Sequence, residues 1–167
     1  NALDYDCDAI VVNAVHFLPQ SRPRLFIFGV QRDIESPYPT SNLVATVFKC
    51  ETRPAALLQA IQNNADLKWR FHCKLPRLPE PSNDLPAILE QDLDDSVWWN
   101  AVRTAVFLKQ LSPLHLNIVR ARQSKTRHSY GTAYRRMRPA GLRMETRFDG
   151  VAGCLRTPRG GSSKQVV

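Results

Sequence analysis

The sequence lacks the patterns that build disulfide frameworks, zinc sites and membrane spans. Its 167 residues include only four cysteines, and no two of them form a Cys-x-x-Cys motif. The one His-Cys pair, His72-Cys73, has no second ligand pair at metal spacing, so we expect neither structural zinc nor disulfides. No apolar run approaches the ~18 residues that span a bilayer, and no signal segment is present. We therefore expect a soluble, cytoplasmic protein that holds no metal.

Acidic residues are scarce in the last third of the chain. Up to Asn117 there are 11 Lys and Arg against 13 Asp and Glu, whereas from Ile118 onward there are 12 against 2. A polyanion bound to this basic stretch would gain from counterion release. A solvated face or a disordered tail is the alternative. Apolar side chains between the arginines favour folded structure: Tyr130, Tyr134, Met137, Leu142, Met144, Phe148 and Val151.

Two arginines stand where an apolar segment begins. Arg22 and Arg24 precede the run Leu25-Phe26-Ile27-Phe28. Side chains two residues apart lie on the same side of a strand, so the pair would form a fork for an anion or another group rich in acceptors. An ordinary start of a strand with solvated arginines is the alternative interpretation.

The sequence around these arginines resembles a known motif. Asn13-Ala14, four residues, Pro-Gln-x-Arg-x-Arg over residues 19–24 and a hydrophobic strand are similar to the eighth sequence motif of the DNA (cytosine-5) methyltransferases. Residues 147–165, Arg-Phe-Asp-Gly-Val-Ala-Gly-Cys-Leu-Arg-Thr-Pro-Arg-Gly-Gly-Ser-Ser-Lys-Gln, resemble the ninth motif of the same family. In that family the two motifs occur in this order, with a variable region of about this size between them.

Other features of that family are missing from the chain. Its members use a cysteine directly after a proline, a glycine-rich turn for the cofactor S-adenosylmethionine, and a Glu-Asn-Val segment. The four cysteines here follow Asp6, Lys49, His72 and Gly153, and no G-x-G-x-x-G signature occurs. We therefore expect the C-terminal part of a methyltransferase catalytic region, cut on both sides. Such a fragment would be inactive alone, with its cofactor site elsewhere.

The resemblance implies roles for the residues of the eighth motif. In the family a thiolate adds to cytosine C6, which lets C5 take the methyl group, and the base must first leave the helix. Arg24 would then bind the cytosine O2 beside the missing glutamate, as the planar, permanently charged guanidinium suits a directed contact. Arg22 would contact a backbone phosphate or the active-site loop. Gln20 and Ser21 would shape the turn at the DNA.

Further DNA-binding candidates lie in the basic third. Arg136 and Arg138 would share one strand face, with Arg135 beside them, as phosphate clamps or bidentate contacts to guanine. Sequence alone does not choose between these. The match to the ninth motif adds a set of candidates near the C-terminus: Arg156, Arg159, Gly160, Gly161, Ser162 and Ser163.

The expected fold class is α/β, as a mixed α+β fragment. Residues 1–33 would hold the last strands of a Rossmann-like methyltransferase sheet, at 8–12 and 24–30. Residues 34–146 would form an irregular target-recognition region with helices at 54–62, 96–111 and 113–122. Residues 147–167 would lead back to the catalytic domain. We interpret Trp98 and Trp99 as core, with a base-stacking platform as the alternative.

Three hypotheses follow. The first is a fragment of a DNA (cytosine-5) methyltransferase with double-stranded DNA as its partner. A companion restriction endonuclease, as in a restriction-modification pair, would then be a second candidate partner. The second is a non-enzymatic nucleic-acid-binding module, for which the basic last third is sufficient. The third is an unrelated α+β interaction protein. A Pro-Cys pair and a cofactor glycine turn upstream in the gene would favour the first.

Overall fold

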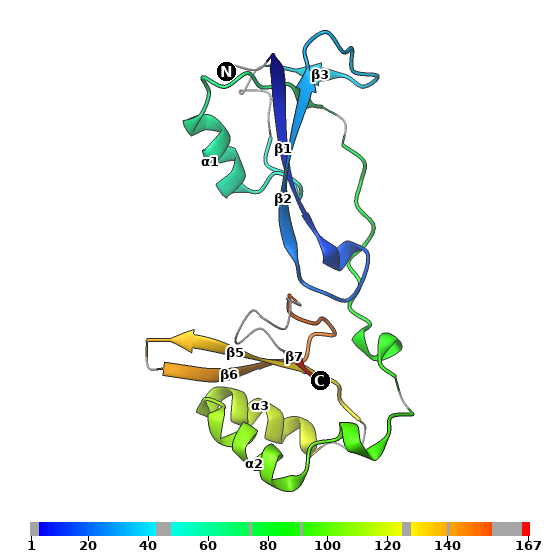
Figure 1. Ribbon diagram of the computed structural model, residues 1–167, viewed down its shortest axis with the longest axis vertical. Helices are drawn as coiled ribbons and strands as arrows, with labels where there is room; N and C mark the ends of the chain where they lie inside the picture. Colours follow the sequence, from blue (N-terminus) through cyan, green and yellow to red (C-terminus); the bar gives the residue numbers. More distant parts are fainter. Residues whose placement is uncertain are drawn as a thin grey trace. The chain divides into compact units, whose positions relative to one another are not determined.

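The chain folds into two compact units of mixed α and β structure. A computed structural model describes residues 4–42, 48–73, 75–90, 92–124, 128–139, 141–154 and 165–167 (Figure 1). Unit 1 comprises Asn1–Asn13 and Pro23–Pro79, and unit 2 comprises Ala14–Arg22 and Glu80–Val167. The described strands form small antiparallel sheets. The functional boundaries at residues 33 and 146 stay a prediction, because motifs rather than contacts define them.

Unit 1 is built on a long hairpin. Strands β1 (Tyr5–Asn13) and β2 (Pro23–Gln31) pair antiparallel along their whole length. Both predicted strands are confirmed, and each extends beyond its predicted limits. A second small sheet joins β3 (Thr40–Ser41) to β4 (Phe71–His72). Within β1 only Asp8 and Ala9 are buried.

The apolar side chains of β2 stay exposed within the described structure. Leu25 and Ile27 point to one side of the strand and Phe26 and Phe28 to the other, and their exposed fractions are 54%, 68%, 47% and 42%. Runs of apolar residues that face both sides of a strand are typical of sheets covered on both faces. Here β2 carries such a run without that cover in the described part of the chain.

A short helix completes unit 1. Helix α1 (Ala55–Asn63) begins after Pro54, whose extended conformation with φ of −64° suits a residue that precedes a helix. Ile61 is buried and anchors the helix. The prediction of a helix at 54–62 is thereby confirmed to within a residue at each end.

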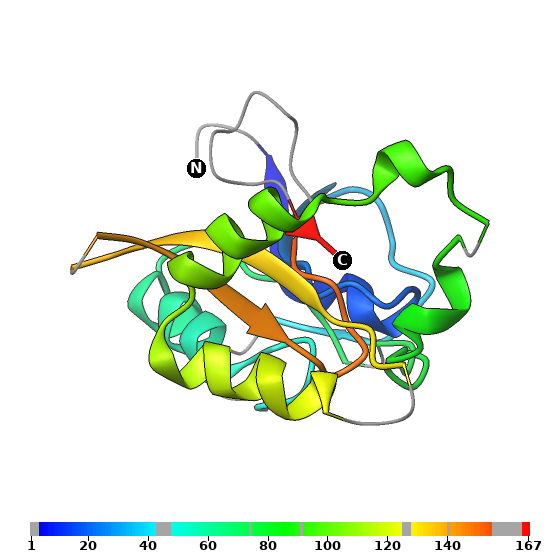
Figure 2. The same cartoon turned by 90° about the horizontal axis from the view of Figure 1, so that it is seen from below.

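Unit 2 packs two helices against a three-stranded sheet. Strands β5 (Thr132–Arg138), β6 (Gly141–Arg147) and β7 (Gln165–Val166) run in the order β6-β5-β7. Helices α2 (Ala101–Gln110) and α3 (Pro113–Gln123) cover one face of the β5–β6 hairpin (Figures 1 and 2). The core between them contains these buried and partly buried residues: Leu111, Ala133, Met144, Phe107, Leu108, Leu116, Val119 and Val166.

Helix α2 starts later than predicted. Asn100 caps it by accepting a hydrogen bond from the Arg103 N–H at 2.9 Å. Asp94 caps a separate 3-10 turn, η4 (Asp95–Val97), by accepting a hydrogen bond from the Ser96 N–H. The expected helix at 96–111 therefore splits in two, because each segment has its own capping side chain.

This split exposes one of the paired tryptophans. Trp98 lies in extended chain between η4 and α2 and is 62% exposed, so its interpretation as core is wrong. Trp99 is half-buried, with its ring edge-on to Phe107 at 5.7 Å between centroids. The Arg103 guanidinium lies over the Trp99 ring, 4.4 Å from its centroid.

Helix α3 follows its sequence signals closely. Ser112 accepts a hydrogen bond from the His115 N–H at 3.4 Å, and Pro113 occupies the first turn. His115 has a structural role, because its Nδ1 accepts a hydrogen bond from the Thr146 backbone N–H at 3.2 Å. None of the helices in the described part of the chain is long and apolar enough to cross a bilayer.

Candidate nucleic-acid interface

Residues 14–22 of the segment that resembles the eighth motif form a closed loop in unit 2. Its first turn is a 3-10 helix, η1 (Ala14–His16), and the Phe17 and Leu18 N–H groups both donate to the Ala14 carbonyl. The Ala14 N–H donates to the Arg22 carbonyl at 3.2 Å and brings the two ends of the loop together. Gln20 is 8% exposed within it. Residues 14–22 are thereby held in one conformation by their own backbone.

This loop is paired with the segment that resembles the ninth motif. The Ser21 N–H donates to the Ala152 carbonyl at 2.8 Å, and the Ala152 N–H donates to the Pro19 carbonyl at 2.8 Å. These two bonds form a parallel β-bridge between Gln20 and Ala152. Two segments from opposite ends of the sequence are therefore joined residue to residue.

A third segment supports both partners of this bridge. The Ser82 N–H donates to the Val15 carbonyl at 2.6 Å, and the Leu85 N–H donates to the Gly150 carbonyl at 3.0 Å. Gly150 has a φ of +76°, and a methyl group added to it would lie 1.7 Å from the Asn83 carbonyl oxygen. The backbone at Asp149-Gly150-Val151 is therefore built for glycine.

The two arginines of the eighth-motif resemblance lie in different elements. Strand β2 begins at Pro23, so only Arg24 is part of the strand, where it pairs with Val12. Arg22 ends the loop of unit 2, and the side chains of both arginines are exposed. Arg24 Nη1 donates to the Pro23 carbonyl at 2.8 Å. The strand therefore contains Arg24 but not Arg22, and the shared face of the pair stays a prediction.

The β5–β6 hairpin carries a basic face opposite its helix-covered side. The register pairs Arg136 with Arg143 and Arg138 with Gly141, which places Arg136 and Arg138 on one face as predicted. Arg135 pairs with Met144 and belongs to the opposite face. We name as the arginine face the six charged or aromatic side chains of the first face: Tyr134, Arg136, Arg138, Arg143, Glu145 and Arg147.

Two of these arginines were missed by sequence reasoning. Arg143 and Arg147 alternate with Glu145, and this period-2 pattern was the available signal. Arg143 is exposed, and no ion pair of Arg143 occurs among the described residues. Arg147 donates from Nε to Asp149 Oδ1 at 2.8 Å. That hydrogen bond is the main cause that lowers the pKa of Asp149 and raises the pKa of Arg147.

Glu145 is the buried anion of the arginine face. It is 9% exposed, and its carboxylate accepts hydrogen bonds from Arg138 Nε at 2.6 Å and from the Tyr134 hydroxyl at 3.2 Å. Burial alone would raise the pKa of Glu145. The hydrogen bond and charge of Arg138, with Tyr134 and Arg136, outweigh burial and lower the pKa. Glu145 is therefore ionised at neutral pH, and its charge offsets part of the basic face.

An aromatic ring supports this face from within. Arg136 lies over the Tyr134 ring at 5.6 Å from its centroid, which fixes a guanidinium plane beside the paired Arg138. The expected folded structure between residues 130 and 151 is thus confirmed by β5 and β6. A further group of predicted DNA-binding residues lies outside the described residues: Arg156, Arg159, Gly160, Gly161, Ser162 and Ser163.

Unit 1 contains a buried ionic cluster that the sequence did not reveal. Arg53 Nη2 donates to both carboxylate oxygens of Asp8 at 2.9 Å, and both side chains are more than nine-tenths buried. His72 donates its backbone N–H to Asp8 Oδ2 at 3.0 Å, and its Nδ1 lies 2.9 Å from the same oxygen. This cluster ties β1, β4 and the turn before α1 together.

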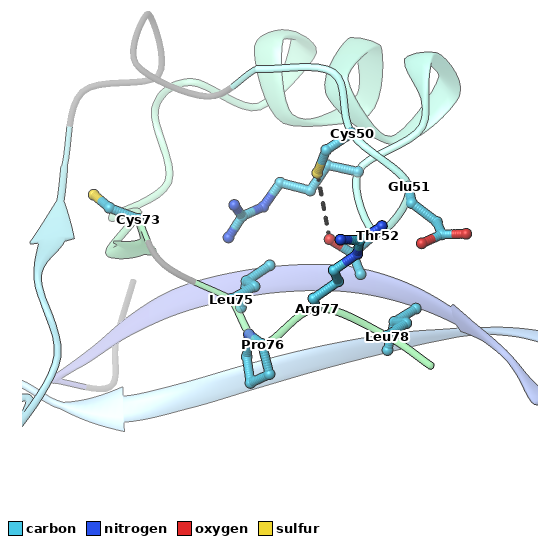
Figure 3. A pocket seen from close by; sticks show the side chains of 9 residues that line it. Cys50, Glu51, Thr52, Cys73, Leu75, Pro76, Arg77 and Leu78 are labelled. Atoms are coloured by element: carbon cyan, nitrogen blue, oxygen red, sulfur yellow. Dashed lines mark hydrogen bonds between the residues drawn. The ribbon is translucent and has the colours of Figure 1, made fainter. Parts of the chain in front are cut away.

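A cavity of about 280 Å³ lies beside this cluster. Figure 3 shows it between Cys50-Glu51-Thr52 and the chain from Leu75 to Leu78. Cys50 Sγ lies 3.3 Å from the Thr52 hydroxyl, which is a poor base at neutral pH. Among the described residues no group of three or more His, Cys, Asp or Glu is placed to hold a metal ion. The cavity therefore presents no nucleophile with a base beside it among its described contacts.

The arrangement in unit 2 thus combines a loop with fixed backbone and a strand pair that displays cations with controlled orientation. Comparisons of the chain with protein-family models, with curated proteins and with solved structures found no match in any of the three.

Proposed function

We propose that this chain is part of a DNA (cytosine-5) methyltransferase, in which it recognises a DNA target and helps hold the flipped cytosine. The observation that carries the proposal is the bridge between Gln20 and Ala152. It joins the two segments whose wording resembles the eighth and ninth motifs of that family. The pairing supports the interpretation of the two matches as parts of one site.

The 167 residues do not fit the cofactor of such an enzyme. They contain no Pro-Cys pair and no glycine-rich turn of the kind that binds S-adenosylmethionine. Cys50 and Cys73, which line the cavity of unit 1, follow Lys49 and His72. We therefore assign the cofactor and the nucleophile to sequence outside these residues, together with the remainder of a Rossmann-like sheet.

The exposed apolar side chains of β2 support the assignment of further catalytic-domain structure to sequence outside these residues. Leu25, Phe26, Ile27 and Phe28 are between 42% and 68% exposed on the two sides of β2. A run of this kind is suited to a sheet covered on both faces. Further catalytic-domain structure packed against β2 would remove this apolar area from water, worth about 25 cal/mol per Å² buried.

Within this proposal Arg24 contacts the base and Arg22 contacts the DNA backbone. Arg24 acts on the flipped base, donating to the cytosine O2, where a charged donor stabilises the negative charge that develops on the ring. Arg22 holds a backbone phosphate from the loop that Gln20 and Ser21 shape. The loop's closure onto Ala152 fixes that phosphate contact before the base is flipped.

The alternative is a non-enzymatic module that binds nucleic acid, and the arginine face is the observation that favours it. Both proposals predict that the isolated chain binds duplex DNA in a salt-dependent manner. They differ in the protein encoded by the complete gene, which methylates cytosine only under the first proposal. Incubating the isolated chain with labelled S-adenosylmethionine and mixed-sequence DNA should leave the DNA unlabelled. Label in 5-methylcytosine from the chain alone would contradict the assignment of the nucleophile and the cofactor site to sequence outside these residues.

A further inference from the structure

Glu145 holds the two arginines of the arginine face that the sequence assigns to DNA. Its Oε1 accepts from Arg138 Nε at 2.6 Å and also pairs with Arg138 Nη2. Arg136 Nη1 lies 3.6 Å from Oε2, which also accepts from Tyr134. The Glu145 side chain is 11% exposed, whereas those of Arg136 and Arg138 are 53% and 48% exposed. A buried anion thus orients two half-exposed cations.

This pairing resists exchange with solvent ions or phosphates. If Arg138 left for a phosphate, the Glu145 carboxylate would lose its closest partner while still largely buried. Breaking a buried ion pair from one side is strongly destabilising because the remaining charge is left uncompensated. Arg138 therefore meets any ligand from the position in which Glu145 holds it.

The donors that Arg138 has left are suited to a base edge. A guanidinium carries five N–H groups, of which those on Nε and on the near side of Nη2 face Glu145. The two parallel N–H groups at the far end, on Nη1 and Nη2, have no partner among the residues that the structure describes. Their fork matches O6 and N7 of guanine in the major groove, the commonest specific arginine contact to DNA.

We propose that Glu145 is a positioning residue that presents Arg138 to a guanine edge of duplex DNA and withholds the charges of Arg136 and Arg138 from phosphates. The inference rests on the proposed DNA-binding function. It adds that guanine is the base recognised and that the fixed orientation of Arg138 distinguishes it from other bases. A cation held by an internal anion contributes little to sequence-independent binding, because it releases few counterions. The same cation held in a fixed plane favours the base that its fork fits.

The test compares four forms of the 167-residue chain. Wild-type protein first selects duplexes from a randomised pool, and one selected duplex and its scrambled counterpart are then titrated at several salt concentrations. The variants are Glu145→Gln, Arg138→Lys and Asp94→Asn. Asp94→Asn is the matched control, because it removes one negative charge from the same unit without releasing an arginine. Asparagine also caps a helix as well as aspartate does.

We expect Glu145→Gln to bind the scrambled duplex more tightly. Its plot of log affinity against log salt should steepen by about 0.9 for each arginine released to a phosphate. Its preference for the selected duplex should fall roughly tenfold, the scale of one bidentate base contact. Arg138→Lys should lose the same preference with an unchanged salt slope, because it keeps the charge and lacks the fork. Asp94→Asn should show neither change.

The possible failures are separable. If Glu145→Gln and Asp94→Asn behave alike in slope and preference, the role of Glu145 is overturned while DNA binding stands. If Arg138→Lys keeps the wild-type preference, the guanine contact is overturned whatever the folding of the Glu145 variant. If the wild-type chain binds no duplex even at low salt, the proposed DNA-binding function itself fails.

Discussion

Gly150 lies directly against the carbonyl oxygen of Asn83, at a distance that leaves no room for a side chain. Its neighbours Val151 and Ala152 continue into the bridge with the 14–22 loop. The contact therefore sets the position of the segment on which the proposed function depends.

Gly150→Ala should lower the free energy of unfolding of the chain by about 2–4 kcal/mol, since both the positive φ and the contact with Asn83 resist a methyl group. Gly141→Ala is the matched control: Gly141 has a φ of +98° with no atom within 4 Å of the added group. The control should cost only about 1–2 kcal/mol, the strain of the left-handed conformation. Chemical denaturation of both variants gives the comparison, and equal losses would show that the Asn83 contact is unimportant.

Arg53→Ala should destabilise the chain by about 3–5 kcal/mol, because it leaves the Asp8 carboxylate buried without its bidentate partner. Arg32→Ala serves as the comparison, since Arg32 pairs with Asp4 and Asp6 in a more exposed setting and should cost about 1 kcal/mol or less. Urea denaturation measures both. A loss below that of Arg32→Ala would mean that the cluster of Asp8, Arg53 and His72 does not hold unit 1 together.

Stability should fall in acid partly through Glu145. Its folded pKa lies below the ordinary value of 4.5, so its contribution is fully present above about pH 4.5 and is lost as the pH falls through the folded pKa. Asp149, whose pKa is lowered mainly by Arg147, acts in the same direction below 3.8. Thermal denaturation of wild type and Glu145→Gln from pH 7 to pH 3 isolates the Glu145 share. The difference in melting temperature between them should shrink as the pH falls, and a constant difference would contradict the paired state of Glu145.

The arginine face should account for more of the salt dependence of DNA binding than the opposite side of the hairpin. Arg143→Ala should weaken binding to duplex DNA and reduce the salt slope by about 0.9, as expected for one lost phosphate contact. Arg135→Ala should change both less, because Arg135 belongs to the face opposite Arg143. Charge reversal at Arg135, Arg136 and Arg138 together should reduce affinity, because it turns three cations of the hairpin into anions. Equal binding by wild type and the triple variant would move the DNA surface elsewhere.

Local signals predicted the local structure well. Ser112 followed by Pro113 marked the start of α3, and Pro54 marked that of α1. The start of α2 was misplaced because Asp94, Ser96 and Asn100 are all capable N-caps, and sequence does not say which hydrogen bond forms.

Long-range partners were beyond such signals. Nothing local indicates that Asp8 finds Arg53 and His72, or that Ala152 lies beside Gln20. The facing of Arg136 and Arg138 followed from the strand period, but their restraint by Glu145 depends on the register across the β5–β6 turn. The sequence therefore predicted the region of the candidate interface. It did not predict which of its arginines are paired with Glu145.

The most direct test of the central claim is methyl transfer by the protein encoded by the complete gene, measured under single-turnover conditions beside a DNA-binding titration. We expect that protein to form 5-methylcytosine from S-adenosylmethionine. Arg24→Ala should slow methylation roughly ten- to a hundredfold, the scale of about 1.5–3 kcal/mol for a charged hydrogen bond, with little loss of DNA affinity. Arg22→Ala should lose more in affinity, and Lys109→Ala, an exposed charge outside both motif segments, should leave both unchanged. Absence of 5-methylcytosine, or methylation by Arg24→Ala at the wild-type rate, would contradict the account.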